Sequence, residues 1–410
     1  MKRRSRFQQR KATGHRGSIT VWTVFVMIGC LCCVSLVANT SYLSVLRSDS
    51  HHCAQVAALA AGRQLLTDDI LRRNQRDFEV AAWRLNAKNA AIDIGQTYAS
   101  GHAVPKLTPQ DIQIEMGSIV DVHIGPALPA AFLPTRILVN VANYGPNRSS
   151  GSFFLSGLTG ITKGKISEHS EVILKNRVIG FRPRRKSATP IVPLALPDDP
   201  ASKSSDCWST EIETGRGKDR LRRDDLRDAV SSGPDRLPEI VLTVNSGDMT
   251  GGPGIAQLVS WNMHTPVRGA LAQFTTGLYP EHLSTNDKGT LVFPSAAGRL
   301  STKADDLRNI RKALRPLVGQ VRIFPLYDAT ARQQSEASGS GGNPRNATAA
   351  SDHQLLRTVA ARILRLEGVS DQQLRIVLQP AVLSTPTAVM ATANDNTPHN
   401  RYVWKICLVR

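Results

Sequence analysis

The side chains best suited to chemistry are few and scattered along the chain. Histidine and cysteine cluster only at His51-His52-Cys53. Successive residues of a helix point about 100° apart, so three neighbouring side chains do not converge on one ion. We therefore predict that this tripeptide marks the interface end of a membrane-spanning helix and holds no metal.

Sequence motifs of catalysis and phosphate binding are absent or incomplete. The glycine-rich stretch 250–254 contains a proline and lacks the Lys-Ser/Thr of a phosphate-binding loop. No G-x-S-x-G nucleophile motif occurs. Asp224-Asp225 and Asp305-Asp306 are sequence neighbours, so they do not flank a substrate as two catalytic carboxylates would. The sequence predicts a non-catalytic protein with no cofactor and no small-molecule substrate. A membrane-tethered hydrolase with a site assembled from distant residues is an alternative.

The distribution of charge bears on a nucleic-acid partner, and the positions of two cysteines bear on a disulfide. The 410 residues include 51 Lys and Arg against 33 Asp and Glu, a net charge of +18. Seven of the positive charges lie in the first 16 residues, and acids interleave the basic stretch 215–228. This distribution predicts no nucleic-acid partner. Cys207 and Cys407 lack metal-ligand spacing. The sequence does not decide whether these two cysteines form a disulfide outside the cytoplasm.

A long apolar segment follows the basic N-terminal tail. No residue from Ser18 to Leu46 is charged, and residues 19–37 are almost wholly apolar. About 20 such residues in a helix cross the roughly 30 Å hydrocarbon core of a bilayer. Because the basic residues precede the span, we expect the N-terminus in the cytoplasm and the bulk of the chain outside it. The prediction is a single-pass protein of the inner (cytoplasmic) membrane.

The apolar segment could also be a cleaved signal peptide or the attachment segment of a lipoprotein. A signal peptide could be cleaved near Leu36-Val37-Ala38, although its apolar core typically has about 7–15 residues and this one is longer. A lipoprotein could be attached through Cys30, although that residue lies in the middle of the apolar run. The retained anchor accounts for the length of the run and is the prediction we keep.

A second helical segment follows the anchor. Residues 51–66 are rich in alanine and contain no proline, a composition that favours helix. Small side chains let helices approach closely, so we predict a helix-packing interface for partner helices at Ala54, Ala57, Ala58 and Ala61. One helix from Ser18 to Leu66 would be roughly 70 Å long and would project beyond the bilayer as a stalk.

The order of these N-terminal features carries a resemblance. Gly17 precedes the apolar run, which is followed by Asn39-Thr40, Arg47 and the stretch 53–60, CAQVAALA. This segment resembles the N-terminus of TadG-like proteins of the bacterial tight-adherence (Tad, Flp) pilus system. Weaker similarity continues at 111–117, 153–164, 179–183, 190–196 and 318–328. Trp22 stands where pilin-like relatives carry the Glu recognised by prepilin peptidase, so a retained anchor is expected.

The resemblance implies a structural or assembly component of the cell envelope. Its implied partners are the inner membrane and other Tad pilus-assembly proteins or envelope components. Some TadG proteins carry a von Willebrand A-type domain with an Asp-x-Ser-x-Ser metal motif, but residues 244–250 have the wrong spacing and are predicted as a turn. The alternative is a membrane-tethered envelope binding module unrelated to pili.

The pattern of the remaining chain predicts an α+β fold. A single N-terminal transmembrane helix, extended by a helical stalk, precedes β-rich extracytoplasmic domains. The predicted boundaries are a basic cytoplasmic tail (1–16), a transmembrane helix (17–46), a helical stalk (47–100), a β-rich domain (101–181), a Pro-rich and charged linker (182–238) and a second β-rich α+β domain (239–410). Helices are predicted over 77–98 and 300–314, and strands over 112–114, 119–124, 137–141, 172–179, 239–244, 320–326, 375–379 and 402–409.

Overall fold

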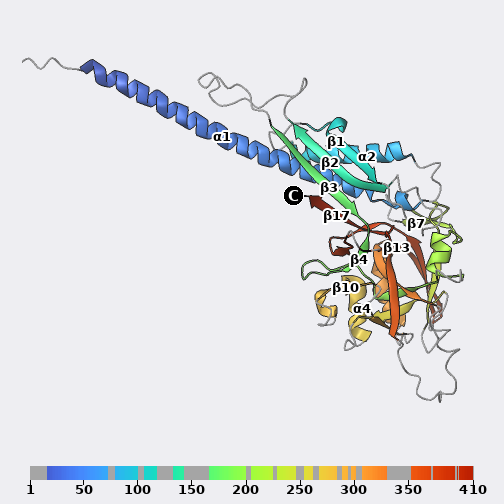
Figure 1. Ribbon diagram of the computed structural model, residues 1–410. Coiled ribbons are helices and arrows are strands. Elements are labelled where there is room, and N and C mark those ends of the chain that lie inside the picture. Colours follow the sequence, from blue (N-terminus) through green and yellow to red (C-terminus); the bar gives the residue numbers. More distant parts are fainter. Residues whose placement is uncertain are drawn as a thin grey trace, which may run out of the picture.

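The computed structural model combines helices and sheets, with one long apolar helix at its N-terminal side and a β-rich remainder (Figure 1). It describes residues 16–72, 79–99, 106–117, 133–142, 166–199, 205–224, 229–245, 254–261, 267–283, 289–293, 297–301, 307–329, 352–370, 373–392, 395 and 397–409. The predicted α+β class is therefore confirmed at this coarse level.

The longest element is helix α1, which runs from Arg16 to Leu65 without a break. No proline interrupts it, and its 50 residues span roughly 75 Å at 1.5 Å per residue. Its N-terminal half projects from the molecule, whereas its C-terminal half lies among strands and a second helix (Figure 1). The apolar run and the alanine-rich segment are thus parts of one rigid rod.

Helix α2 (Val80–Ala99) packs on the C-terminal half of α1, close to the predicted helix 77–98. Its buried side chains recur every fourth position and are mostly small: Trp83, Ala87, Ala91 and Gly95. The Cys53 thiol lies 3.7 Å from the carbonyl oxygen of Gly95, so the two helices approach closely there. Close approach of this kind requires small residues on both helices.

A five-stranded sheet covers another side of α1. Its strands are β1 (Ile112–Gly117), β2 (Leu133–Ala142), β3 (Ser167–Lys175), β17 (Val403–Val409) and β15 (Leu383–Ser384), in that order. All neighbours are antiparallel except β15 and β17. Alternate residues of β2 and β3 are buried, which places Ile137, Val139 and Val172 on one face. That face packs against α1.

Because β17 pairs with β3, residues 178–400 form a unit inserted between two neighbouring strands of this sheet. The strand pairings therefore connect residues on both sides of the predicted boundaries at 181 and 238. The predicted linker 182–238 contains strands β5 (Leu194–Asp198), β6 (Leu221–Asp224) and β7 (Ala229–Ser232), and β5 is buried along its whole length. Proline is tolerated at Pro197 because strand β9 pairs only with Leu194 and Ala195.

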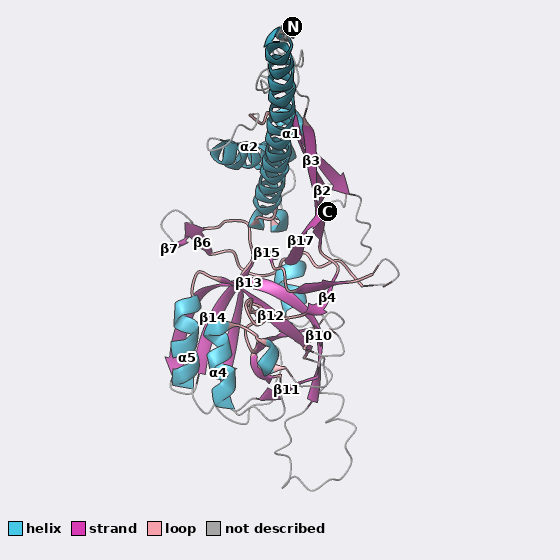
Figure 2. Ribbon diagram, turned by 90° about the vertical axis from the view of Figure 1, so that its left-hand side faces the viewer, coloured by secondary structure: helices cyan, strands magenta, loops and turns pink. Residues whose placement is uncertain are grey.

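The inserted unit is built on a seven-stranded sheet. Its order is β11 (Ala297–Ser301), β9 (Gln257–Ser260), β5, β12 (Val321–Asp328), β13 (Asp352–Ser370), β14 (Gln373–Pro380) and β8 (Ile240–Asn245). Only β5 and β12 run parallel. β11 also pairs with β13, so the pairings of β11, β9, β5, β12 and β13 close into a ring. Helices α4 (Val267–Thr276) and α5 (Leu307–Leu314) lie side by side on this unit (Figure 2).

Smaller elements complete the described part of the chain. A three-stranded sheet joins β10 (Leu291–Val292), β4 (Val178–Phe181) and β16 (Ala388–Met390), and β6 pairs with β7. Four short 3-10 turns and one π-helical turn lie at Asp68–Leu71, Pro109–Asp111, Pro280–His282, Arg315–Leu317 and Ser209–Glu213. A methyl group added at Gly180 would lie 2.1 Å from the carbonyl oxygen of Leu291, so only glycine lets β4 and β10 meet.

Most predicted elements that fall on described residues coincide with observed ones, with two differences. Predicted strand 172–179 breaks at Asn176 and Arg177, which separate β3 from β4. The helix predicted from Leu300 is wrong at its start, since Leu300 and Ser301 belong to β11 and α5 begins at Leu307. The strand predicted over 119–124 lies outside the described residues.

Candidate functional site: the long apolar helix and its surroundings

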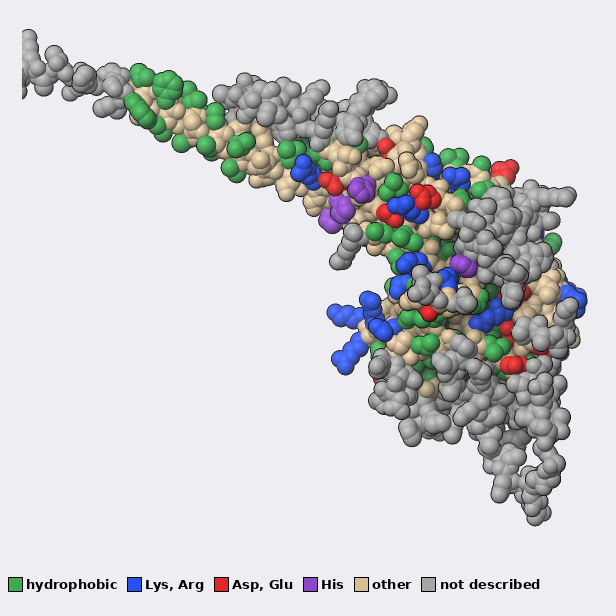
Figure 3. All heavy atoms as spheres, in the orientation of Figure 1, with side chains coloured by type: hydrophobic (Ala, Val, Ile, Leu, Met, Phe, Trp, Pro, Cys, Tyr) green, Lys and Arg blue, Asp and Glu red, His purple; other side chains and the backbone are tan. Residues whose placement is uncertain are grey.

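The N-terminal half of α1 leaves its apolar side chains uncovered. Trp22 is 70% exposed, Phe25 68% and Met27 66%, and apolar side chains follow this half of the helix in Figure 3. Among the described helices, this one alone is long and apolar enough to cross a membrane: its most apolar 18 residues have a mean hydropathy of 2.5. An exposed apolar surface of this size marks contact with lipid or with another protein.

Polar side chains in this half are bonded within the helix itself. The Thr23 hydroxyl donates to the carbonyl oxygen of Thr20 at 2.8 Å, and the Thr40 hydroxyl donates to that of Leu36 at 2.9 Å. The Asn39 amide donates to the Ser35 hydroxyl at 3.4 Å. Since a bilayer core offers no water to satisfy polar groups, internal bonding of this kind suits a lipid environment.

The four predicted interface alanines, Ala54, Ala57, Ala58 and Ala61, are completely buried within the chain. The predicted interface for partner helices lies instead where α1 packs against α2 and the five-stranded sheet of the same chain. The small-residue pattern signals close packing, but a sequence pattern does not say whether the packing neighbour lies in the same chain.

Two sides of α1 are occupied by different neighbours. A methyl group at Gly62 would lie 3.5 Å from Ile137, Val172 and Leu174, so this side faces β2 and β3. Ala58 lies one helical turn before Gly62 and shares that side, because residues four apart are stacked along a helix. A second side of α1 packs against α2, because Cys53 of α1 contacts Gly95 of α2. The C-terminal half of α1 is thus enclosed, and the N-terminal half projects from the enclosure.

A charged contact fixes the end of α1 to the inserted unit. Asp68, just after the helix, pairs with Arg362 of β13 at 2.9 Å. Its other carboxylate oxygen accepts a hydrogen bond from the Val382 amide at 2.7 Å. These partners are far apart in sequence, and no local pattern singles out Asp68, so sequence reasoning missed this contact. It couples the direction of α1 to the large sheet.

A second charged cluster lies inside the inserted unit. Arg357 of β13 reaches Glu213 at 2.7 Å and Asp198 at 3.0 Å. The Tyr402 hydroxyl donates to Glu213 at 3.3 Å and accepts from the Trp208 indole at 3.3 Å. Because Tyr402 immediately precedes β17, this cluster links the inserted unit to the strand that completes the five-stranded sheet.

The electrostatics of this cluster indicate a structural role. Burial alone would raise the pKa of Glu213, but the charge of Arg357 and its hydrogen bonds outweigh burial and lower the pKa. Burial raises the pKa of the Tyr402 phenol, with the Glu213 charge acting in the same direction. The acid therefore stays ionised and the phenol neutral, which matches a satisfied buried network.

The histidine and cysteine side chains do not gather. His51 bonds to Gln55 at 2.8 Å, and its ring centre lies 6.3 Å from that of His52. Among the described residues, no three His, Cys, Asp or Glu side chains are arranged to hold a metal ion. Burial raises the pKa of Cys53 to about 11. All six cysteines are free thiols in the structure. Cys207 and Cys407 therefore do not form a disulfide in it.

The other motifs considered in the sequence fall mainly outside the described residues. These are most of the glycine-rich stretch 250–254, the turn after Asn245, and Asp305-Asp306. Asp224 is the last residue of β6, and its neighbour Asp225 is not described. Comparison of the chain with protein-family models, with curated proteins and with solved structures gives no match.

Proposed function

We propose that this chain is a single-pass, membrane-anchored structural or assembly protein of the bacterial cell envelope. The observation that carries the proposal is the two-part helix α1, with one half enclosed by the outer fold and the other half uncovered and apolar. The span begins near Thr20, and the basic residues before it favour a cytoplasmic N-terminus. The folded units then stand on the extracytoplasmic face of the inner membrane.

The role proposed within the envelope is that of a TadG-like component of Tad pilus assembly. Its support is the resemblance of the N-terminal segment, from Gly17 through the stretch 53–60. The contribution of the protein is physical rather than catalytic: a continuous helix holds a folded unit at a fixed distance and direction from the bilayer. Partner helices would contact the uncovered half of α1, since the alanine face is already occupied.

Topology reporters and carbonate extraction test the anchor. Alkaline phosphatase fused after Thr67 and after Arg410 should be active at both points, with the protein resistant to extraction at high pH. Replacing Leu31 and Val34 by Lys should release the protein from membranes, because each Lys near a helix centre costs about 2.5–3.5 kcal/mol of insertion. Leu85→Lys, on an exposed position of α2, is the matched control and should stay membrane-bound.

A separate experiment tests the pilus role. Photo-reactive residues at Val21 and Phe25, two exposed anchor positions, should cross-link in cells to inner-membrane proteins of the Tad system. The same residue at Leu85 should not give those products. Cross-links to unrelated membrane proteins would reject the pilus role while leaving the anchor intact. A wild-type protein found in the soluble fraction would reject both.

A further inference from the structure

Helix α5 and the turn after it carry a stripe of positive charge. Arg308, Arg311, Lys312 and Arg315 are spaced three, four and seven residues apart, so they share one side of the helix. The adjoining side of the helix carries the buried residues Leu307, Ile310 and Leu314. Like charges three or four apart destabilise an isolated helix by about 0.2–0.5 kcal/mol per pair. Arg311 and Lys312 lie in the last turn, where the helix dipole favours positive charge, but the repulsion within the stripe remains and an anion beside it would relieve that repulsion.

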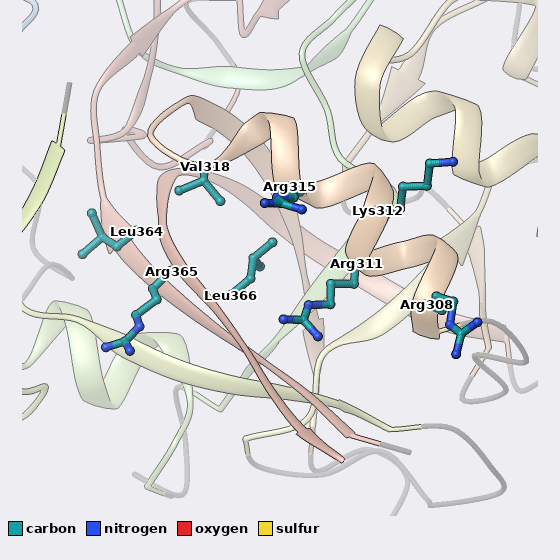
Figure 4. A pocket seen from close by; sticks show the side chains of 8 residues that line it. All are labelled: Arg308, Arg311, Lys312, Arg315, Val318, Leu364, Arg365 and Leu366. Carbon is teal, nitrogen blue, oxygen red and sulfur yellow. The ribbon is translucent and has the colours of Figure 1, made fainter. Parts of the chain in front are cut away.

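This stripe forms one wall of a cavity of about 650 Å³. The other wall comes from β13, and apolar side chains line the space between them: Val318, Leu364 and Leu366. Figure 4 shows Arg311 and Arg315 extending from the helical segment toward Leu366, with Arg365 on the far side of the strand. The groove is apolar in its middle and cationic at its margins.

The positive charge of the groove is largely uncompensated. Within the part of the chain that the structure describes, Arg365 pairs with Glu367 at 3.3 Å, and the four cations of the stripe have no acid partner. Among the described residues, the groove thus has five cationic side chains and one acidic side chain, Glu367, that pairs with any of them. A ligand that supplies negative charge at the margins and apolar groups in the middle would match both features.

An open strand edge borders the same groove. β12 pairs with β13 from Leu355 to Arg362, and Val318 forms one further bridge with Ile363. β13 continues to Ser370, but among the described strands none pairs with it on this side beyond Ile363. An unpaired edge offers backbone donors and acceptors to an added strand.

We propose that this groove binds an acidic polypeptide segment of a partner protein in extended conformation. Side chains of an extended chain alternate between two sides. Acidic residues would then meet Arg311 and Arg315 while intervening apolar residues contact Leu366 and Val318. The apolar lining disfavours a polyphosphate, which has no apolar groups to place there. Contact with bilayer headgroups is disfavoured by position, since α5 lies at the opposite end of the molecule from the free half of α1 (Figure 2).

Fluorescence anisotropy with a short labelled peptide that alternates Glu and Val tests the proposal on the full chain in nanodiscs. We expect saturable binding that weakens as salt rises. The double variant R311E/R315E should weaken binding at least tenfold. The matched control R184E/R185E changes two exposed arginines elsewhere and should bind as the wild type does. Circular dichroism melting establishes that each variant is folded.

Three results would overturn the proposal. Binding of the peptide that is equal in R311E/R315E and wild type would place the contact elsewhere. Binding of the counterpart that alternates Lys and Val would show that charge does not select the ligand. Polyphosphate that binds more tightly than the peptide, and that loses affinity in R311E/R315E, would make the groove a phosphate site. The assay needs no pilus component, so its outcome is independent of the proposed assembly role.

Discussion

At the level of single residues, Arg357 balances two buried acids inside the inserted unit. Replacing Arg357 by Met removes the arginine that forms ion pairs with both Asp198 and Glu213. We expect a loss of about 3 kcal/mol in the free energy of unfolding, the lower end of the range for breaking a buried ion pair, because 39% of the Arg357 side chain is exposed. Urea unfolding at neutral pH measures this loss. A change within about 0.5 kcal/mol, as for ordinary surface residues, would contradict the structural role.

The same pair predicts a pH dependence. The pKa of Glu213 is lowered below its ordinary value of 4.5, so its ionised form stabilises the fold above that pH. The contribution disappears as the pH falls through the lowered pKa. In Arg357→Met, burial of Glu213 is opposed only by the weaker effects of Arg401 and Tyr402, so the acid protonates at a higher pH than in the wild type. The stability difference between wild type and variant should therefore shrink as the pH falls below 4.5, and a constant difference would argue against the Glu213 contact.

Single residues also show the limit of sequence interpretation. The alanine spacing at 54, 57, 58 and 61 predicts a packed face, and that face is packed. The element that packs on this face could not be predicted, because small side chains allow close packing against any helix or sheet, in the same chain or in another. The Arg357 cluster was missed for another reason: its members come from β5, a π-helical turn, β13 and the residue before β17, so they share no local motif.

At the level of elements, the enclosed half of α1 should be sensitive to side-chain size. Ala58→Leu adds volume between α1 and the sheet, where neighbouring positions are already in contact. We expect destabilisation of roughly 1–3 kcal/mol from overpacking. Val56→Leu adds volume on the same helix at a position that is 37% exposed, and it should change stability little. Thermal unfolding in detergent compares the two, and equal effects would contradict the packing described.

Helices and strands whose apolar residues recur at helical or strand spacing could be predicted from the sequence, and other elements could not. β12 and β14 lie where runs of apolar residues indicate strands, and α2 lies where helical spacing indicates a helix. β13 was missed although it is the longest strand, because its Leu, Ala and Arg are good helix formers and tertiary pairing with β12 and β14 decides its conformation. β5 was not predicted because Pro197 and the prolines on either side of the strand indicate an extended linker.

At the level of the whole molecule, β17 completes the five-stranded sheet from the far side of the inserted unit. A chain truncated after Tyr402 should leave β3 with only β2 beside it. We expect faster amide hydrogen exchange across β3 and faster proteolysis of the α1 enclosure, with β12, β13 and β14 still protected. Removal of Arg410 alone is the control. Unchanged protection of β3 would show that β17 contributes little to the sheet.

This arrangement has a consequence for the order of synthesis. α1, β1, β2 and β3 leave the ribosome first, but the strand that closes their sheet follows only after more than two hundred further residues. During that interval the inserted unit is translated while the β3 edge has no partner from β17. A waiting strand edge invites mispairing. A factor that shields this edge during synthesis would therefore raise the yield of folded protein, whereas one acting after β17 has emerged would come too late.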